Sequence, residues 1–295
     1  MISIIITSYN EGSEVATTIE SIRKNTSDFE IVLVDDASTD NSCIGVACDQ
    51  LVRHDERVGI APSRIHGVAI AKGDCYYFLD AHQRLSEGCA NKCAELAMER
   101  QAIVWPDVNG LGASTWVGHG ANMRQKEDTR RRKVKQGLFE GVWRRTKPRD
   151  TISRCSAMVV PGYAIPKTVW SKVKLIEGMQ IHGASEMCLC VKAFFTDVDI
   201  LHLCGPLAKH KFNSKVPFPL RGRTQIRNHA LVARVCFDQS TWDNYWIERF
   251  RRGLKDEGLK EFALDPIVQW HKEFQEIKCR PDDEFWRGLI GQEPK

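Results

Sequence analysis

The sequence predicts an α/β protein in which a mostly parallel sheet is flanked by helices and followed by a helical C-terminal extension. Two observations lead to this fold class. Short β-branched runs alternate with stretches of helical periodicity over the first hundred residues, and only helical periodicity is found after about residue 219. A β-α-β-α order is typical of parallel sheets with helices on both faces. In such sheets, ligands bind at the carboxyl ends of the strands.

The first half of the chain supplies the clearest elements. Ile2–Thr7 is a buried-strand pattern, and the helix after it is indicated by apolar residues at helical spacing in "EVATTIESI". Glu30–Val34 is the second strand and ends at a paired aspartate. The segment "APSRIHGVAIAKG" predicts a helix that Gly73 terminates. The strand "CYYFLD" follows, and after one more helix comes the strand "AIVWPDV".

The second half is less regular. Glycines and basic residues dominate from Gly110 to Lys147, which predicts a long flexible loop. A strand, a turn and a helix are then indicated by "SAMVVPGYAIPKTVWSKV", and a helix and a strand by "GASEMCLCVKAFFT" and "VDILHL". A boundary is expected near Pro219. The predicted division is a catalytic domain, 1–218, made of a nucleotide-binding half (1–109), a basic loop (110–150) and an acceptor half (151–218), and a helical extension, 219–295.

Composition is that of an ordinary globular protein, with 42% hydrophobic and 27% charged residues in a chain of 295. No apolar run approaches the roughly 20 residues that a membrane span needs, and the N-terminus has no signal-peptide pattern. We therefore expect a cytoplasmic protein with no membrane partner. The 11 cysteines include no CxxC pair and no zinc-type spacing, so free thiols in a reducing compartment are expected.

Positive charge is concentrated in two stretches. Residues 124–149 hold 11 Lys/Arg and 3 Asp/Glu, a local charge of +8 in a chain whose net charge is +4. Residues 200–237 hold seven Lys/Arg and no acidic residue. Such runs are usually solvated surface. Two of them beside a phosphate site favour a polyanionic ligand, and double-stranded DNA is one candidate partner.

Acidic and histidine side chains follow two of the predicted strands. Asp35 and Asp36 could hydrogen-bond a ribose or the N–H edge of a uracil, although Asp-Asp-x-Ser is also common in turns and caps. Asp80 and His82 share one side of an extended segment, since side chains two apart lie on one face. A carboxylate and an imidazole suit a borderline metal such as Mn²⁺. An isolated Asp-x-His is, however, more often a turn and a surface histidine.

Further candidates come from later segments. His210 follows "VDILHL" and offers a third metal ligand, whereas His202 lies within that strand and is more easily a core residue. Arg64 is expected to reach a diphosphate or a uracil, with a solvated helix arginine as the alternative. Glu186 starts a helix and is expected to act as an acid/base or to orient an acceptor. Its alternative is a first-turn glutamate favoured by the helix dipole.

The order of these segments carries more weight than any one of them. "MISIIITSYNEG", "EIVLVDDASTD", "RVGIAPSRIHG" and "YYFLDAH" together resemble the nucleotide-binding half of GT-A-fold glycosyltransferases. The Asp-x-His version is similar to the polypeptide N-acetylgalactosaminyltransferases. "CGPLAKHKF" resembles the segment of that family with the metal-binding histidine and places His210 on it. "HGASEM" matches the catalytic helix of the family loosely, because His182 replaces a tryptophan and Ser185-Glu186 replaces Glu-Asn.

The resemblance implies a metal-dependent, retaining transfer of a hexose or N-acetylhexosamine from a UDP-sugar. It places Mn²⁺, or Mg²⁺, on Asp80, His82 and His210. It implies catalytic roles for Glu186 and Arg64. The nucleotide site is expected to contain Thr7, Tyr9, Glu11, Asp35, Asp36, Arg64 and Asp80.

The two basic stretches bear on which acceptor receives the sugar. The basic stretches favour a 5-hydroxymethylated pyrimidine in DNA as the single acceptor, as in phage DNA-modifying enzymes, with Trp143 and the cations around it contacting the backbone and a flipped base. No recognised DNA-binding motif is present. The alternative is a cytoplasmic enzyme acting on a protein Ser/Thr, a glycan or a lipid-linked acceptor. A third reading is an inactive relative that binds nucleotide-sugar, which the loose "HGASEM" match suggests.

Overall fold

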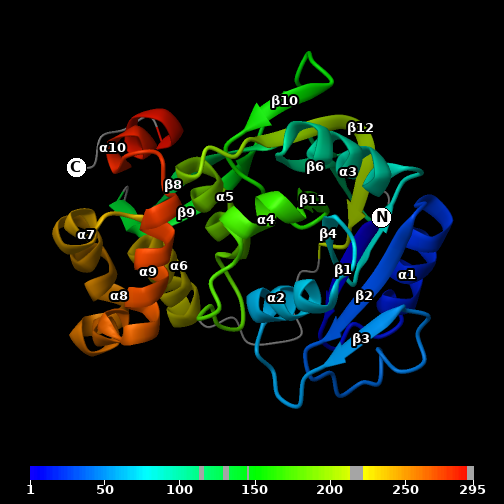
Figure 1. Ribbon diagram of the computed structural model, residues 1–295, viewed down its shortest axis with the longest axis horizontal. Coiled ribbons are helices and arrows are strands. Elements are labelled where there is room, and N and C mark those ends of the chain that lie inside the picture. Colours follow the sequence, from blue (N-terminus) through cyan, green and yellow to red (C-terminus); the bar gives the residue numbers. More distant parts are fainter. Residues whose placement is uncertain (113–115, 129–132, 145, 213–221, 291–295) are drawn as a thin grey trace.

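The structure is a computed structural model that describes residues 1–112, 116–128, 133–144, 146–212 and 222–290. A ten-stranded sheet forms its centre, in the order β10-β12-β6-β11-β4-β1-β2-β3, with β5 beside β12 and β7 beside β6 (Figure 1). These strands are β1 (Ile2–Ser8), β2 (Phe29–Asp35), β3 (Gln50–Arg53), β4 (Cys75–Asp80), β5 (Gln83–Leu85), β6 (Ile103–Gly110), β7 (Val117–Gly118), β10 (Ile152–Cys155), β11 (Tyr163–Pro166) and β12 (Ile200–His210).

The pairing confirms the predicted fold class. Strands β4, β1, β2 and β3 are parallel neighbours, and β6 is parallel to β12. Strand β11 lies antiparallel between β4 and β6 and joins the two parallel parts. All the parallel strands of the first part end at the same edge of the sheet, so the residues that follow them come close together.

Helices cover both faces of the sheet because its central strands are apolar on both sides. Ile4 and Ile6 of β1 pack into one buried cluster with α1 and α3, whereas Ile5 packs into the opposite cluster with α2, α4 and α5. This is the two-residue alternation of a strand buried on both faces. The helices are α1 (Glu14–Asn25), α2 (Ile60–Ile70), α3 (Cys89–Arg100), α4 (Lys167–Val173) and α5 (Ser185–Phe195).

The prediction of a flexible loop over 110–150 was wrong for much of this segment. Strands β8 (Ala121–Asp128) and β9 (Lys133–Trp143) form an antiparallel two-stranded sheet. Met123 and Phe139 are buried on it, and Phe139 stacks on Phe237 of the C-terminal region. The apolar positions are too widely spaced among charges to give a clear pattern, and packing against distant helices stabilises the strands.

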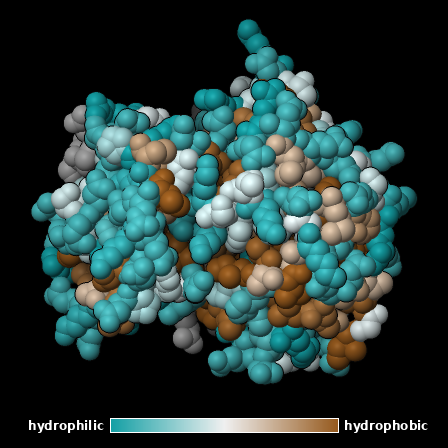
Figure 2. Space-filling view, in the orientation of Figure 1, coloured by the Kyte–Doolittle hydropathy of each residue, from teal (hydrophilic) through white to brown (hydrophobic). Residues whose placement is uncertain are grey.

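The C-terminal region is helical, as expected. Its helices pack into the same buried cluster as the sheet, which includes Leu231, Trp246 and Phe285 (Figure 1, left). They present mainly hydrophilic residues on the face in Figure 2, where hydrophobic residues gather over α2 and the nearby sheet edge. The proposed domain division remains a prediction, and its boundary at Pro219 lies outside the described residues. The helices are α6 (Gly222–Cys236), α7 (Gln239–Thr241), α8 (Ile247–Leu259), α9 (Asp265–Ile277) and α10 (Asp282–Glu284), and shorter helical turns are formed by Trp242–Trp246, Lys260–Ala263 and Phe285–Ile290.

Two further properties concern the predictions from composition. All 11 cysteines are free thiols, as the sequence predicted. Among the helices in the described part of the chain, none combines the length and the apolar character that crossing a bilayer requires.

Candidate active site

A pocket of about 510 Å³ opens where the strands β1, β4 and β12 end. The parallel register sets Thr7 of β1 beside Asp80 of β4, and the antiparallel pairing of β5 with β12 sets His210 opposite Gln83. Residues from distant parts of the chain thereby meet at one edge of the sheet. The side chains that line the pocket include Thr7, Tyr9, Glu11, Asp36, Arg64, Asp80, His82, Glu186 and His210.

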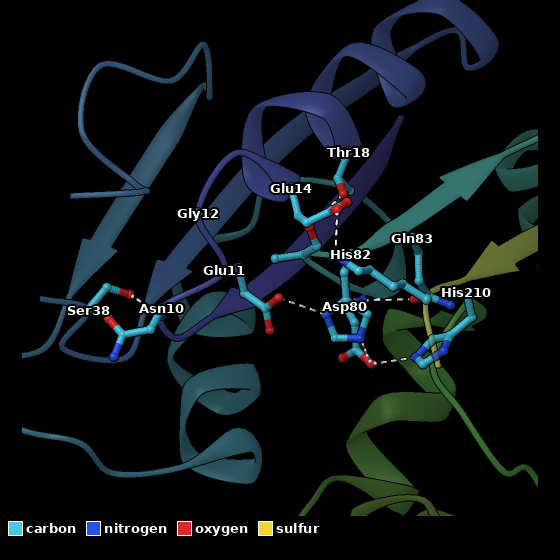
Figure 3. A network of polar contacts seen from close by, with 12 residues as sticks. Asn10, Glu11, Gly12, Glu14, Thr18, Ser38, Asp80, His82, Gln83 and His210 are labelled. Atoms are coloured by element: carbon cyan, nitrogen blue, oxygen red, sulfur yellow. Dashed lines mark hydrogen bonds and ion pairs between the residues drawn. The ribbon is translucent and has the colours of Figure 1, made fainter. Parts of the chain in front are cut away.

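Asp80, His82 and His210 form a cluster at the base of this arrangement (Figure 3). Their ligand atoms lie within 4.8 Å of one another. The Nε2 atoms of His210 and His82 lie 3.4 Å and 3.9 Å from Oδ2 of Asp80. These separations exceed those of a good hydrogen bond. The cluster therefore has the donor types and the spacing that a divalent metal requires.

The charges in the cluster favour an ionised carboxylate. Burial would raise the pKa of Asp80, but His210, His82 and Arg64 outweigh it and lower that pKa to about 2. Burial alone would lower the pKa of His82. The carboxylates of Glu11 and Asp80 outweigh burial, so the pKa of His82 is raised. Nδ1 of His82 lies 3.1 Å from Oε2 of Glu11 (Figure 3). A carboxylate on the far nitrogen of a histidine is the usual way to orient a metal ligand.

Arg64 links this cluster to the first turn of α5. Its guanidinium is 2% exposed, contacts Oε1 of Glu186 at 2.8 Å and Tyr163 Oη at 3.1 Å, and lies 3.8 Å from Asp80. Burial disfavours the charged form, but Tyr163, Glu186 and Asp80 outweigh it and raise the pKa of Arg64. A permanent positive charge is therefore held between two carboxylates, which it positions relative to each other.

The paired aspartates behave differently from each other. Asp35 is fully buried, accepts a hydrogen bond from Ser38 N at 2.8 Å and pairs with Arg53, and it does not line the pocket. Successive side chains of a strand point to opposite faces, so only one of the pair reaches the site. That residue is Asp36, which also accepts from the amides of Val58 and Gly59 at 2.8 Å and 2.9 Å.

The loop that Asp36 holds closes one side of the pocket. Gly59, with φ +104°, lies against Ile181, whose backbone atoms would be only 2.3 to 2.5 Å from a Cβ at this position. Glycine is thus required for this contact between two halves of the chain. Arg57 of the same loop lies over the ring of Tyr9 at 4.2 Å.

Sequence reasoning did not select every residue of the site. Arg57, His182, Lys211 and Phe212 also line the pocket. His182 was noted only as a departure from the family motif, and burial lowers its pKa. Arg57 begins the segment "RVGIAPSRIHG" and Phe212 ends the segment "CGPLAKHKF", and their place in these segments was the one available signal.

Part of the basic stretch 124–149 is engaged within the protein. Arg124 pairs with Glu140 at 2.8 Å, and Arg144 donates to Ser153 and to the carbonyl of Arg154. Lys147 and Arg149 are exposed, and Arg145 lies outside the described residues. Trp143 stacks on the buried Trp105 at 5.4 Å, so one face of its ring is occupied.

Comparison with protein families and curated relatives shows what the chain is similar to. Residues 3–146 match the family model of glycosyl transferase family 2. The chain is 32% identical to "Glycosyltransferase GlyG" of Streptococcus pneumoniae serotype 4 over 35% of this chain and 37% of that protein. It is 26% identical to human polypeptide N-acetylgalactosaminyltransferase 14 over 99% of this chain and 57% of that protein. The chain therefore spans less than two thirds of the length of either relative.

Among solved structures, the fold is similar to that of GalNAc-T7, crystallised with UDP, GalNAc and Mn²⁺. The TM-score is 0.72 at 20% sequence identity, and the match covers 98% of this chain and 57% of that one. At this identity the likeness establishes the fold, which is that of the GT-A glycosyltransferases.

Proposed function

We propose that this chain, whose residues 3–146 belong to glycosyl transferase family 2, transfers a sugar from a UDP-sugar to a hydroxyl acceptor with the help of a divalent metal. The observation that carries the proposal is the convergence of Asp80, His82 and His210 at the carboxyl edge of the sheet, inside the pocket. The intact ligand set argues against an inactive relative.

The donor set fits Mn²⁺. One carboxylate and two imidazoles suit a borderline metal better than an all-oxygen Mg²⁺ site does. The 3.4 Å and 3.9 Å separations around Oδ2 of Asp80 leave room for an ion between the three side chains. A metal bound there supplies Lewis-acid neutralisation of the diphosphate leaving group.

The residues of the chain prepare this chemistry. Asp80 is ionised at neutral pH, because its pKa is lowered to about 2, and so offers a full negative charge. Glu11 holds His82 in orientation, and Arg64 holds Asp80 and Glu186 apart at fixed positions. Preorganised charges of this kind need no rearrangement when the leaving group departs. Arg64 is thus assigned a positioning role, beside the nucleotide contact expected from sequence.

The nucleotide is proposed to lie along the ends of β1 and β2. Thr7, Tyr9 and Asp36 line this side of the pocket, and Arg57 covers the ring of Tyr9. The aromatic ring and the guanidinium provide a flat surface for a base. Asp36 provides a carboxylate beside it, although two backbone amides already bind that side chain. Asp35 has no part in this assignment.

The acceptor is proposed to approach past Glu186, which is 20% exposed and has Oε1 fixed on Arg64. Two acceptor classes have separate support. The names of the relatives favour a polypeptide hydroxyl, with N-acetylgalactosamine as the sugar. Exposed Lys147 and Arg149 support the hydroxymethylated DNA base predicted from sequence. Arg124 and Arg144 already make contacts within the protein, which leaves less charge for a phosphate backbone.

One assay tests donor, metal and acceptor together. The protein is incubated with a mixture of UDP-sugars, Mn²⁺, and either Ser/Thr peptides or hydroxymethylated DNA, and the products are analysed by mass spectrometry. We expect UDP release and a mass gain of one hexose or N-acetylhexosamine on one acceptor. Absence of both UDP release and transfer with every UDP-sugar contradicts the proposal. A shallow salt dependence of acceptor binding contradicts the DNA arm alone.

A further inference from the structure

A second group of metal-binding side chains lies where β6 and β12 meet the segment after β7. Asp107, His119, His202 and Cys204 each offer a donor atom, and these atoms lie within 4.8 Å of one another. Asp107 and His202 are buried, and the other two are partly buried. None of the four lines the pocket described above. The proposed sugar transfer therefore leaves this cluster unexplained.

The cluster is built by an irregularity in β12. The pairing with β6 runs from Leu203 opposite Pro106 directly to Leu207 opposite Asp107, so residues 204–206 form a bulge. Bulges re-aim side chains at functional positions. Here Gly205, with φ +113°, donates its N–H to Oδ2 of Asp107 at 2.9 Å, and Cys204 lies beside the same carboxylate.

His119 reaches the carboxylate from the other side. Strand β7 pairs with β6 through Gly118 opposite Val108, and His119 follows at once. Its Nδ1 lies 2.6 Å from Oδ1 of Asp107, and Nε2 of His202 lies 2.8 Å from the same oxygen. Sγ of Cys204 lies 4.0 Å from it. Two segments, β12 and the residues after β7, thus direct nitrogen and sulfur donors at one carboxylate oxygen of β6.

The histidine ring in the middle of this group is held by one nitrogen only. His202 is fully buried, and its Nε2 faces Asp107, whereas Nδ1 is on the other side of the ring. The observation that points to a ligand is therefore the convergence itself: nitrogen and sulfur atoms of metal-binding type surround one largely buried carboxylate, and all four donor atoms lie within 4.8 Å of one another.

We propose that Asp107, His119, His202 and Cys204 bind a Zn²⁺ ion as a second metal site, separate from the pocket. Two imidazoles, a carboxylate and a thiolate are the ligand types that zinc takes, and four protein ligands are typical of structural sites. The negative charges of the carboxylate and the thiolate balance the charge of the ion. The site fastens the bulge of β12 to β6 and to the segment that carries His119.

The required movement is small. Zinc bonds of about 2.0 to 2.3 Å in tetrahedral geometry set ligand atoms roughly 3.3 to 3.8 Å apart. The two histidine contacts on Asp107 must therefore widen, and the contact of Cys204 must shorten slightly. Burial and the charge of Asp107 raise the pKa of the Cys204 thiol, so metal binding releases the thiol proton to solvent. His119, with 19% of its side chain exposed, provides the route of entry.

Cobalt distinguishes this site from the pocket cluster, which contains no sulfur. The full chain is stripped of metal with a chelator and titrated with Co²⁺ while its absorption spectrum is recorded. We expect a thiolate-to-cobalt charge-transfer band and the visible bands of tetrahedral cobalt, reaching a plateau by two equivalents per chain because the pocket cluster also takes up Co²⁺. Added Zn²⁺ should abolish both. The absence of a thiolate band in the wild-type protein overturns the proposal.

Four variants test which residues bind the cobalt. Cys204→Ser should abolish it, whereas Cys155→Ser, which changes a nearby thiol on β10, should retain it. Asp80→Asn alters only the pocket cluster and should also retain it. His119→Asn, at a partly exposed position, should weaken Co²⁺ binding at least tenfold with an unchanged far-ultraviolet circular dichroism spectrum. A band that survives Cys204→Ser overturns the proposal, and His119→Asn tests it separately should the serine variant not fold.

Discussion

Two clusters of acidic and histidine side chains share strand β12 and differ in how closely their side chains approach one another. His210, at the end of the strand, joins Asp80 and His82 in the pocket, with separations of 3.4 Å and 3.9 Å at the carboxylate. His202, near the start of the strand, belongs to the second cluster. There Nδ1 of His119 and Nε2 of His202 lie 2.6 Å and 2.8 Å from Oδ1 of Asp107. The histidine nitrogens therefore lie farther from the carboxylate in the pocket cluster than in the second cluster.

The number of ligands and the access explain this difference. A metal that takes part in catalysis keeps a coordination position for substrate, which three side chains beside a pocket allow. Four donors around a bulge leave no such position and suit a structural ion. The same residue types on one strand are therefore expected to serve different purposes, and variants should separate activity from stability.

The largest effect is expected from Asp80→Asn. Loss of the charged ligand removes metal and hence neutralisation of the leaving group, so kcat should fall about a thousandfold. Arg64 retains Glu186 as a partner, and the fold should persist. Release of UDP measured with saturating Mn²⁺ checks the activity, and the cobalt–thiolate band checks the second cluster. A variant that keeps a tenth of the activity contradicts the assignment of the pocket cluster.

Asp107→Asn should show the opposite pattern. The amide cannot accept the bonds of His119, His202 and Gly205 together, so the free energy of unfolding should fall by about 2 to 3 kcal/mol without metal. With Zn²⁺ present the difference from wild type should grow, because only the wild type gains the binding energy. Urea denaturation with and without chelator measures both values. A loss of activity as large as that of Asp80→Asn would remove the distinction between the clusters.

The two clusters also differ in how far the sequence predicted them. Asp80, His82 and His210 were selected because strand patterns placed them at carboxyl ends and because their motifs resembled a family. In the second cluster only Cys204 lies in a segment that resembles the family, "CGPLAKHKF", and only His210 was selected from that segment. Its ligands come from three segments, one of them in the poorly patterned region around His119, and His202 was interpreted as a core residue. It is indeed buried, but which donors meet it depends on a bulge that no spacing rule indicates.

Other differences have similar physical causes. The alternation of strands and helices in the first hundred residues was predicted because each element carries its own periodicity. The hairpin of β8 and β9 was missed because its stability comes from contacts such as Phe139 with Phe237, which are remote in sequence. Asp35 was grouped with Asp36 because adjacent residues share a motif, although strand geometry sends them to opposite faces.

A smaller effect is expected from Glu11→Gln, which tests the outer contact of the pocket cluster. The amide no longer holds Nδ1 of His82 by charge, so Mn²⁺ affinity should fall about 10- to 100-fold. At saturating Mn²⁺, kcat should stay within a fewfold of wild type. Activity as a function of Mn²⁺ concentration measures this, with Glu20→Gln on the exposed face of α1 as the matched control. Equal Mn²⁺ affinities in both variants would show that Glu11 does not support His82.

The smallest effect is expected from Gly205→Ala, which tests whether the bulge or the four ligands define the second cluster. A side chain at φ +113° costs about 1 to 2 kcal/mol through backbone strain. Gly45→Ala, at φ +72° and with nothing within 4 Å of the added Cβ, is the control for strain alone. Both variants should lose similar stability in urea. Only Gly205→Ala should weaken Co²⁺ binding at the thiolate, because the strained backbone shifts the amide that holds Oδ2 of Asp107. If the two variants bind Co²⁺ equally well, the bulge merely carries Cys204 and does not set the geometry of the site.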